Sequence, residues 1–240
     1  MIDSAKRFSD EAIYLNEPAR EKPKEIFVQF GNLIETLGFG GSLRILDVGC
    51  AAGKLVKYLS QRFPQSENTG MDVSLAMITQ AQQDIPQSRF YTGSALDVDD
   101  YPSEKFDVVV SSGVLCIFDD FERPLSHMLS CIRKGGAVLI YTLINDDPVD
   151  VIMRYRRSEG EEEGEWEQGW NIVSKKTYEK TLHRLDPSLK WAWHPFEISF
   201  PLEKGDDPMR TWTLGTDDKP RQLVNGACQL VNTQFLLITS

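Results

Sequence analysis

Hydrophobic residues in the first part of the chain recur at two different spacings, which predicts helices and strands in turn. Between Pro23 and Gly38 they follow the three- and four-residue intervals of an amphipathic helix, with Pro23 suited to its first turn and Gly38 to its end. Residues 43–48 form a short apolar run typical of a buried strand. Similar runs predict strands at 68–71, 89–92, 106–110 and 137–144.

Apolar residues at helical spacing separate these strands. They predict helices around 55–63, 77–81 and 125–132, with Ser74 placed to cap the second helix and Gly135 and Gly136 to end the third. Strands that alternate with helices pair in parallel and are covered on both faces. The pattern therefore predicts an α/β fold with a doubly wound, mostly parallel sheet.

The second half of the chain is less regular. Ser174 is predicted to cap a helix that runs to Leu185, followed by an extended segment at 191–200, a hairpin built from 211–214 and 221–224, and a final strand at 228–239. The insertion at 145–173 carries a run of glutamates, typical of a solvated, mobile surface segment: Glu159, Glu161, Glu162, Glu163, Glu165 and Glu167.

The composition limits the partners that this chain can have. With 240 residues, 41% of them hydrophobic, it can bury one substantial core. Its net charge of −10 offers no basic surface for nucleic acid. The four cysteines include no C-x-x-C pair, which argues against a zinc site or disulfides, and no stretch approaches the ~18 apolar residues of a membrane span. We expect a cytoplasmic protein with no membrane or nucleic acid partner.

The residues after the first predicted strand carry candidate chemistry. In residues 45–53 (ILDVGCAAG) an acid, Asp47, stands near the carboxyl end of the strand. The small residues Gly49, Cys50, Ala51 and Gly53 follow, where a ligand must approach the backbone closely. Open α/β sheets bind ligands at that edge. The segment therefore predicts a ligand site.

This segment resembles the first motif of the class I S-adenosylmethionine-dependent methyltransferases, D-x-G-x-G-x-G, with Ala51 where many members have glycine. Nicotinamide-binding proteins use a related glycine turn, G-x-G-x-x-G, in which a pyrophosphate lies at the helix N-terminus. Asp47 would repel a pyrophosphate, whereas it favours the cationic sulfonium and amino group of S-adenosylmethionine. A nicotinamide dehydrogenase is therefore the less favoured interpretation.

Further segments resemble motifs of the same family in the correct order. Residues 72–77 (DVSLAM) look like its second motif, which implies that Asp72 holds the ribose and Met77 covers the adenine; helix capping by Asp72 is the alternative role. Residues 93–95 (GSA) resemble the adenine-edge motif, with Ser94 in place of an aspartate and Asp97 as a substitute acceptor. Residues 106–115 and 132–136 resemble the fourth-strand motif and the turn before the fifth strand.

The resemblance implies a complete cofactor site and a fold. The fold is a Rossmann-like, mostly parallel seven-stranded sheet with helices on both faces, an antiparallel C-terminal strand and inserted segments. One methyltransferase domain would span 1–240, with a helical cap at 1–42, a cofactor-binding core at 43–144, an acidic insertion or lid at 145–173 and an acceptor side at 174–240. The site for S-adenosylmethionine, and for its product S-adenosylhomocysteine, would comprise Asp47, Gly49, Cys50, Ala51, Gly53, Asp72, Val73, Met77, Ser94, Ala95, Ser111, Ser112 and Val114.

The catalytic group is not identified by the sequence. Methyl transfer is an in-line displacement from an activated donor, so the protein mainly aligns the reactants. Cys116 and Ile117 stand where many family members carry a Glu-His pair, which leaves Asp146 and His194 as weak candidates for a base. Acids such as Asp119 and Asp147 follow the predicted strands, but turns and caps explain such pairs, and we expect no metal.

The acceptor is expected to be a small molecule. Five tryptophans lie in the C-terminal half, where aromatic faces could stack on a sugar or a secondary metabolite, although packing in the core or in a lid explains them equally well: Trp166, Trp170, Trp191, Trp193 and Trp212. The alternative is a non-catalytic protein that binds S-adenosylmethionine and acts as a regulator or partner. Whether the chain is a monomer or a homodimer stays open.

Overall fold

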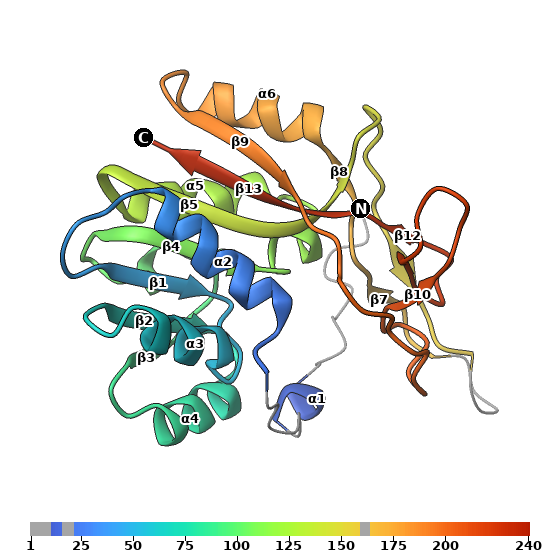
Figure 1. Cartoon of the computed structure of the whole chain (residues 1–240), viewed down its shortest axis with the longest axis horizontal. Helices are drawn as coiled ribbons and strands as arrows, with labels where there is room; N and C mark the ends of the chain where they lie inside the picture. Colours follow the sequence, from blue (N-terminus) through green and yellow to red (C-terminus); the bar gives the residue numbers. More distant parts are fainter. Residues whose placement is uncertain (1–10, 16–21, 159–163) are drawn as a thin grey trace.

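A computed structural model describes residues 11–15, 22–158 and 164–240 of the chain (Figure 1). The main sheet has the strand order β3-β2-β1-β4-β5-β13-β9, and a short strand, β8 (Val173–Ser174), pairs with the end of β5. The five strands β1 (Arg44–Val48), β2 (Glu67–Asp72), β3 (Arg89–Thr92), β4 (Phe106–Ser112) and β5 (Ile132–Asn145) pair in parallel.

The last strand of the chain, β13 (Thr233–Thr239), runs antiparallel between β5 and β9 (Lys190–Pro195). The carboxyl end of β9 therefore lies at the same edge of the sheet as those of β1, β4 and β5. The predicted doubly wound sheet, mostly parallel and with an antiparallel C-terminal strand, is confirmed.

Helices cover both faces of the sheet. On one face lie α2 (Glu25–Thr36) and α3 (Lys54–Arg62) (Figure 1). Their residues Phe30 and Leu59 pack in one cluster with Ile45 and Val110 of the sheet. On the other face α5 (Glu122–Cys131) and α6 (Lys175–Leu185) pack on Leu46, Val109 and Ile140. The remaining helices are α1 (Glu11–Leu15), α4 (Leu75–Asp84) and two short 3-10 turns, η1 (Val98–Asp100) and η2 (Leu115–Ile117).

The caps of α4 and α6 follow the sequence prediction, whereas Pro23 lies before α2 and its N-cap, Lys24, and not in the first turn of that helix. Ser74 accepts a hydrogen bond from the Met77 amide at the start of α4, and Ser174 accepts one from the Thr177 amide at the start of α6. Gly38, with φ of +65°, lies just after α2. The two serine caps satisfy amide groups that the first turn of a helix leaves without partners.

The end of α5 differs from the prediction. The helix stops at Cys131, and β5 begins at Ile132 rather than after the two glycines. Ile132 pairs with Phe106, and Ala137 with Val108, so the register shifts between them. Gly135 adopts a φ of +74° inside this irregular stretch. The glycines therefore shape the start of the strand and do not end the helix.

The insertion at 145–173 is more ordered than its glutamates suggest. A two-stranded ladder joins β6 (Arg154–Tyr155) to β7 (Glu167–Gln168), and Val151 forms an isolated bridge with Ile172. Tyr155 donates a hydrogen bond to Glu167, whereas Glu165 is exposed. Of the other glutamates, Glu159, Glu161, Glu162 and Glu163 lie outside the described residues. The prediction of a solvated, mobile segment is therefore wrong for the paired residues of this insertion.

A second, smaller sheet follows β9 along the chain. It consists of β10 (Trp212–Leu214), β11 (Gln222–Val224) and β12 (Leu230–Val231), all antiparallel, which confirms the predicted hairpin. The predicted strand at 228–239 is divided between β12 in this sheet and β13 in the main one. None of the helices in the described part of the chain is long and apolar enough to cross a membrane.

Candidate functional site

The chain turns sharply between β1 and α3. Gly49, Ala51 and Gly53 have φ values of +79°, +48° and +75°, a region that glycine adopts without the steric cost that a side chain brings. A Cβ on Gly49 would lie 2.3 Å from Val114 Cγ2, so only glycine fits there. The amides of Gly49 and Cys50 both donate to the Met71 carbonyl, at 2.8 and 3.0 Å. The turn is thus bound to the end of β2.

Asp47 is buried beside this turn. It is 2% exposed and lies in β1 between Gly70 of β2 and Val110 of β4. Its Oδ1 atom has no hydrogen-bond partner among the described residues. Burial, with a further contribution from the charge of Asp72, raises the pKa of Asp47 to about 8. Within the described ranges, Oδ1 of this carboxyl therefore lacks the partner that a buried acid normally has.

Asp72 connects the turn to the next helix. One carboxylate oxygen accepts from the Ala51 amide at 2.9 Å, and the other accepts from the Ser74 amide at 2.9 Å. Ser74, and not Asp72, caps α4, so the structure does not give Asp72 the capping role that the sequence left as the alternative. Each oxygen has a second lone pair, so Asp72 can still accept hydrogen bonds from a ligand.

Two apolar residues of the second motif lie in different environments. Val73 is 74% exposed, whereas Met77 is 7% exposed. Val73 thus presents an apolar surface next to Asp72 that a flat ring could cover. Met77 offers little surface to a ligand in this conformation.

The loop after β3 uses its polar groups internally. The Ser94 hydroxyl accepts from the Leu96 amide at 3.2 Å, while the Ser94 amide donates to Asp100 Oδ2 at 2.8 Å. Asp97 accepts from the Asp99 amide at the start of η1. The sequence did not single out Asp100, because nothing distinguishes it from its acidic neighbours until the loop is folded.

The residues after β4 close the site from the other side. Ser111 is fully buried and donates to the Val48 carbonyl at 2.9 Å, which ties β4 to the end of β1. Val114 packs against Gly49, and Ser112 is half-buried. Ala95, by contrast, packs against the hydrophobic core and accepts at its carbonyl from Tyr101, at 3.1 Å.

The side chain of Cys50 does not face the edge of the sheet. It packs in a cluster with Val56, Ile78 and Phe90 between the helices and β3, and burial raises the pKa of its thiol. Only the backbone of Cys50 belongs to the turn. The fold therefore brings together, at one edge, Asp47, the turn at 49–53, Asp72 and the residues after β4.

Known proteins are similar in sequence to the part of the chain that contains this edge. The methyltransferase domain family matches residues 46–138. A trans-aconitate 2-methyltransferase of Deinococcus radiodurans is 32% identical over 105 residues, which cover 43% of this chain and 39% of the relative. A malonyl-[acyl-carrier protein] O-methyltransferase of Ilyobacter polytropus is 31% identical over 102 residues, 42% of this chain and 38% of the relative. Residues 46–138 are thus similar to a methyltransferase domain, as the sequence predicted.

The methyltransferase fold extends beyond the matched residues. The solved structure of an amino pentose methyltransferase from Micromonospora echinaspora aligns with a TM-score of 0.61 over 99% of this chain and 98% of its own, at 12% identity. The family prediction is thus confirmed, and the fold of the whole chain agrees with it. The sequence matches nevertheless span less than half the length of either curated relative.

Asp146 lies outside the methyltransferase domain match and is committed to other partners. It forms an ion pair with Lys175 at 2.6 Å and accepts from Asn232 at 2.9 Å. The hydrogen bond from Lys175 lowers the pKa of this exposed carboxyl. A base with a lowered pKa removes protons less readily at neutral pH. The contacts of Asp146 therefore argue against a role as general base.

His194 lies far from the glycine turn. A row of paired residues crosses the sheet from Ser112 through Tyr141 and Phe235 to His194. Three strand spacings separate the ends of this row, roughly 14 Å. The Nε2 atom of His194 is buried and has no hydrogen-bond partner among the described residues. An acceptor in contact with His194 would therefore lie far from Asp47.

The tryptophans divide between packing and surface positions. Trp191 and Trp193 pack against the core beside α6, and Trp170 packs with Cys116 near η2. Trp166 is 53% exposed, with Arg156 over its ring at 5.2 Å. Lys204 lies over the ring of Trp212 at 4.9 Å. At least three of the five therefore have packing roles.

A buried asparagine that the sequence did not single out connects the insertion at 145–173 to the segment after β4. Asn171 is fully buried; its amide group donates to the Phe118 carbonyl at 3.1 Å and to Asp119 at 3.0 Å, and it accepts from the Met153 amide at 2.9 Å. Asp119 also pairs with Arg154. Across the described part of the chain, no three His, Cys, Asp or Glu side chains lie together where they could hold a metal ion.

Proposed function

We propose that this chain transfers a methyl group from S-adenosylmethionine to a small-molecule acceptor. The observation that carries the proposal is the buried carboxyl of Asp47, whose Oδ1 atom has no hydrogen-bond partner among the described residues and which lies beside a turn that only small residues can form. Ionised, it would attract the positive sulfur and the amino group of the donor. The pyrophosphate of a nicotinamide cofactor would meet repulsion from Asp72, and it would gain no attraction when Asp47 ionises.

The site residues would share the task of holding the donor. Asp47 supplies negative charge, the backbone of Gly49 and Gly53 leaves room for close approach, and Asp72 offers free lone pairs to ribose hydroxyls. Val73 would cover the adenine. Ser94, Ala95 and Asp100 would lie at the edge of the adenine, and Ser112 and Val114 would face the reacting end.

Methyl transfer from this donor requires few catalytic groups of the protein. When bound, S-adenosylmethionine supplies a methyl group already activated by positive sulfur, so no nucleophilic side chain is required. The protein aligns the acceptor and excludes water. An acceptor with a neutral nitrogen needs no general base, whereas a hydroxyl does. The ion pair of Asp146 and the distant position of His194 fit the first kind of acceptor better.

The proposal also concerns the chemical class of the acceptor. We keep the expectation of a sugar or secondary metabolite, bound between the glycine turn and the C-terminal half. The curated relatives are named for trans-aconitate and malonyl-[acyl-carrier protein], both acids, so a carboxylate is the competing class. The division into a helical cap, a cofactor core, an insertion and an acceptor side is part of the same proposal.

Calorimetric titration with S-adenosylmethionine, S-adenosylhomocysteine and NADH tests the proposal. We expect S-adenosylmethionine and S-adenosylhomocysteine to bind and NADH not to bind. The Asp47→Asn variant should bind S-adenosylmethionine more weakly and keep its fold. Transfer of a radiolabelled methyl group to pooled small metabolites then tests catalysis. Binding without turnover would support the alternative, a regulatory protein. Absence of donor binding, or tight NADH binding, would overturn the assignment.

A further inference from the structure

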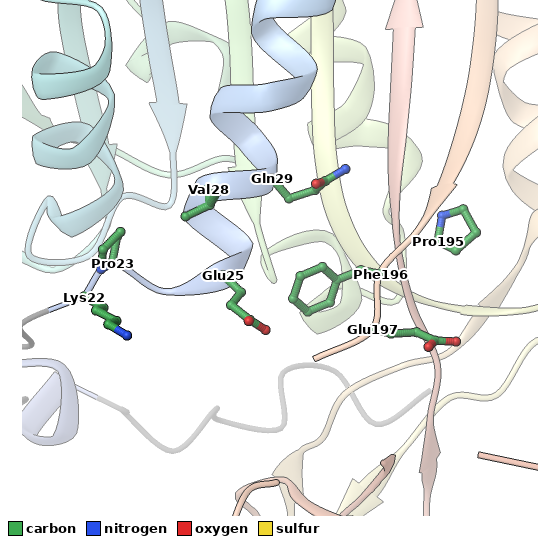
Figure 2. Close-up of a pocket in the computed structure, with 8 residues that line it drawn as sticks. All are labelled: Lys22, Pro23, Glu25, Val28, Gln29, Pro195, Phe196 and Glu197. Carbon is green, nitrogen blue, oxygen red and sulfur yellow. The ribbon is translucent and has the colours of Figure 1, made fainter. Parts of the chain in front are cut away.

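A groove lies at the same edge of the sheet, and the inference drawn from it rests on the proposed function. The groove has a volume of about 480 Å³ and is formed by the first turns of α2 and the segment that follows β9 (Figure 2). Glu25, Val28 and Gln29 line it from α2, and Phe196 and Glu197 from the other side. Because β9 is parallel to β1 and β4, both the groove and Asp47 belong to the carboxyl edge of the sheet.

Direct contacts connect the groove to the proposed donor site. Ser112 pairs with Tyr141 on the neighbouring strand, on the face that α2 covers. The ring of Tyr141 meets the ring of Phe196 edge-on, with 5.5 Å between the centroids. One strand spacing and this contact place Phe196 roughly 10 Å from Ser112. A small molecule of that length would reach from the donor to the groove.

The charges of the groove favour a cation. Its walls carry two carboxylates, Glu25 and Glu197, and one ammonium, Lys22. The Ser199 amide donates to Glu25 at 2.8 Å, which fixes that side chain, while Glu197 is exposed and forms no ion pair within the described part of the chain. In Figure 2 the ring of Phe196 lies between the two glutamates. An aromatic ring flanked by carboxylates attracts an ammonium group.

Four positive side chains elsewhere in the C-terminal half already have acidic partners. Arg154 pairs with Asp119 near the end of β4, and Lys175 pairs with Asp146 after β5. Arg157 and Arg210 share Asp207, at 3.0 and 3.7 Å. An acidic acceptor would compete with these carboxylates for its binding partners.

We propose that the groove binds a positively charged amine of the acceptor, so that the substrate is an amine-bearing small molecule. At roughly 10 Å from Ser112 this ammonium serves recognition, and a different atom of the acceptor receives the methyl group. Phe196 and Glu197 are then determinants of specificity, and the acceptor differs in charge from those for which the curated relatives are named.

Three probes with the same phenethyl skeleton test the charge preference: phenethylamine, 2-phenylethanol and 3-phenylpropionate. Each is titrated into the full chain loaded with S-adenosylhomocysteine, and binding is followed by NMR spectroscopy of the protein. We expect the amine to bind at least about threefold more tightly than the alcohol, and the acid to bind most weakly. The Glu197→Gln variant should bind the amine two- to fivefold more weakly, as is typical of a solvent-exposed charge pair, and its affinity for the alcohol should not change.

The matched control is Glu203→Gln, which removes an exposed glutamate outside the groove and should change none of the three affinities. The Phe196→Ala variant should bind both the amine and the alcohol more weakly. Equal or tighter binding of the acid, or an amine affinity insensitive to Glu197→Gln and Phe196→Ala, would overturn the charge proposal alone. If S-adenosylhomocysteine fails to bind in the loading step, the proposed function fails as well.

Discussion

The affinity for S-adenosylmethionine should depend on pH through Asp47. Burial and the nearby charge of Asp72 raise the pKa of this carboxyl from 3.8 to about 8. At about 1.4 kcal/mol per pKa unit, ionisation in the folded protein costs on the order of 6 kcal/mol more than in water. At neutral pH the protein without ligand therefore holds Asp47 protonated, and a cationic ligand must displace that proton.

The expected effect is large enough to measure directly. Below the pKa, affinity should fall about tenfold for each pH unit, so binding at pH 6 should be roughly 50-fold weaker than at pH 8. Calorimetry in two buffers with different ionisation enthalpies should show the release of nearly one proton per ligand at pH 6.5. The amino group of the ligand also titrates near pH 8, and the Asp47→Asn variant reports that contribution alone.

The comparison of the two proteins decides the matter. The ratio of wild-type to variant affinity should rise with pH and level off above pH 8. If both proteins show the same pH dependence and the same proton release, Asp47 does not exchange a proton for the ligand, and the reasoning from its burial is refuted.

Three further predictions concern stability and are read from denaturant unfolding. The pKa of Asp47 is higher in the folded protein than in the unfolded chain, so the stability that its protonated form contributes is full below about pH 4 and is lost as the pH rises to 8. The Asp47→Asn variant should therefore gain stability relative to wild type between pH 5 and pH 8. A difference in stability that stays constant over this range would contradict the prediction. Gly49→Ala should lose more than about 2 kcal/mol through its φ of +79° and its clash with Val114, whereas Gly38→Ala, with a φ of +65° and open space, should lose only about 1 to 2; equal losses would count against the clash. Asn171→Ala should cost about 2 to 4 kcal/mol by leaving buried groups without partners, against less than about 1 for Gln168→Ala, and similar costs would show that Asn171 is not the hub.

Local patterns account for the parts of the fold that the sequence predicted. The runs at 43–48 and 106–110 are apolar because β1 and β4 are covered on both faces, and Ser74 and Ser174 cap helices through contacts three residues away. The end of α5 was misplaced because the pairing of Ile132 with Phe106 depends on a strand distant in sequence. Such pairing overrides the local signal of two glycines.

The residues of the candidate site also differ in whether a local pattern or a distant partner reveals them. Asp47 and Gly49 belong to one contiguous motif and could be singled out directly. Asp100, Asn171 and Phe196 could not, because their importance comes from partners that only the folded chain supplies: the Ser94 amide, Asp119 and the ring of Tyr141. Nor could the sequence show that Asp146 is held by Lys175.

The titration of Asp47 itself tests the central claim most directly. Carbon-13 NMR of the aspartate carboxyls, with Asp47→Asn to assign the signal, gives its pKa with and without S-adenosylhomocysteine, which keeps the amino group of the donor. We predict a pKa near 8 in the free protein, and a fall of at least 2 units when the ligand binds. A pKa that the bound ligand leaves unchanged would contradict the assignment of Asp47 as the partner of a cationic donor.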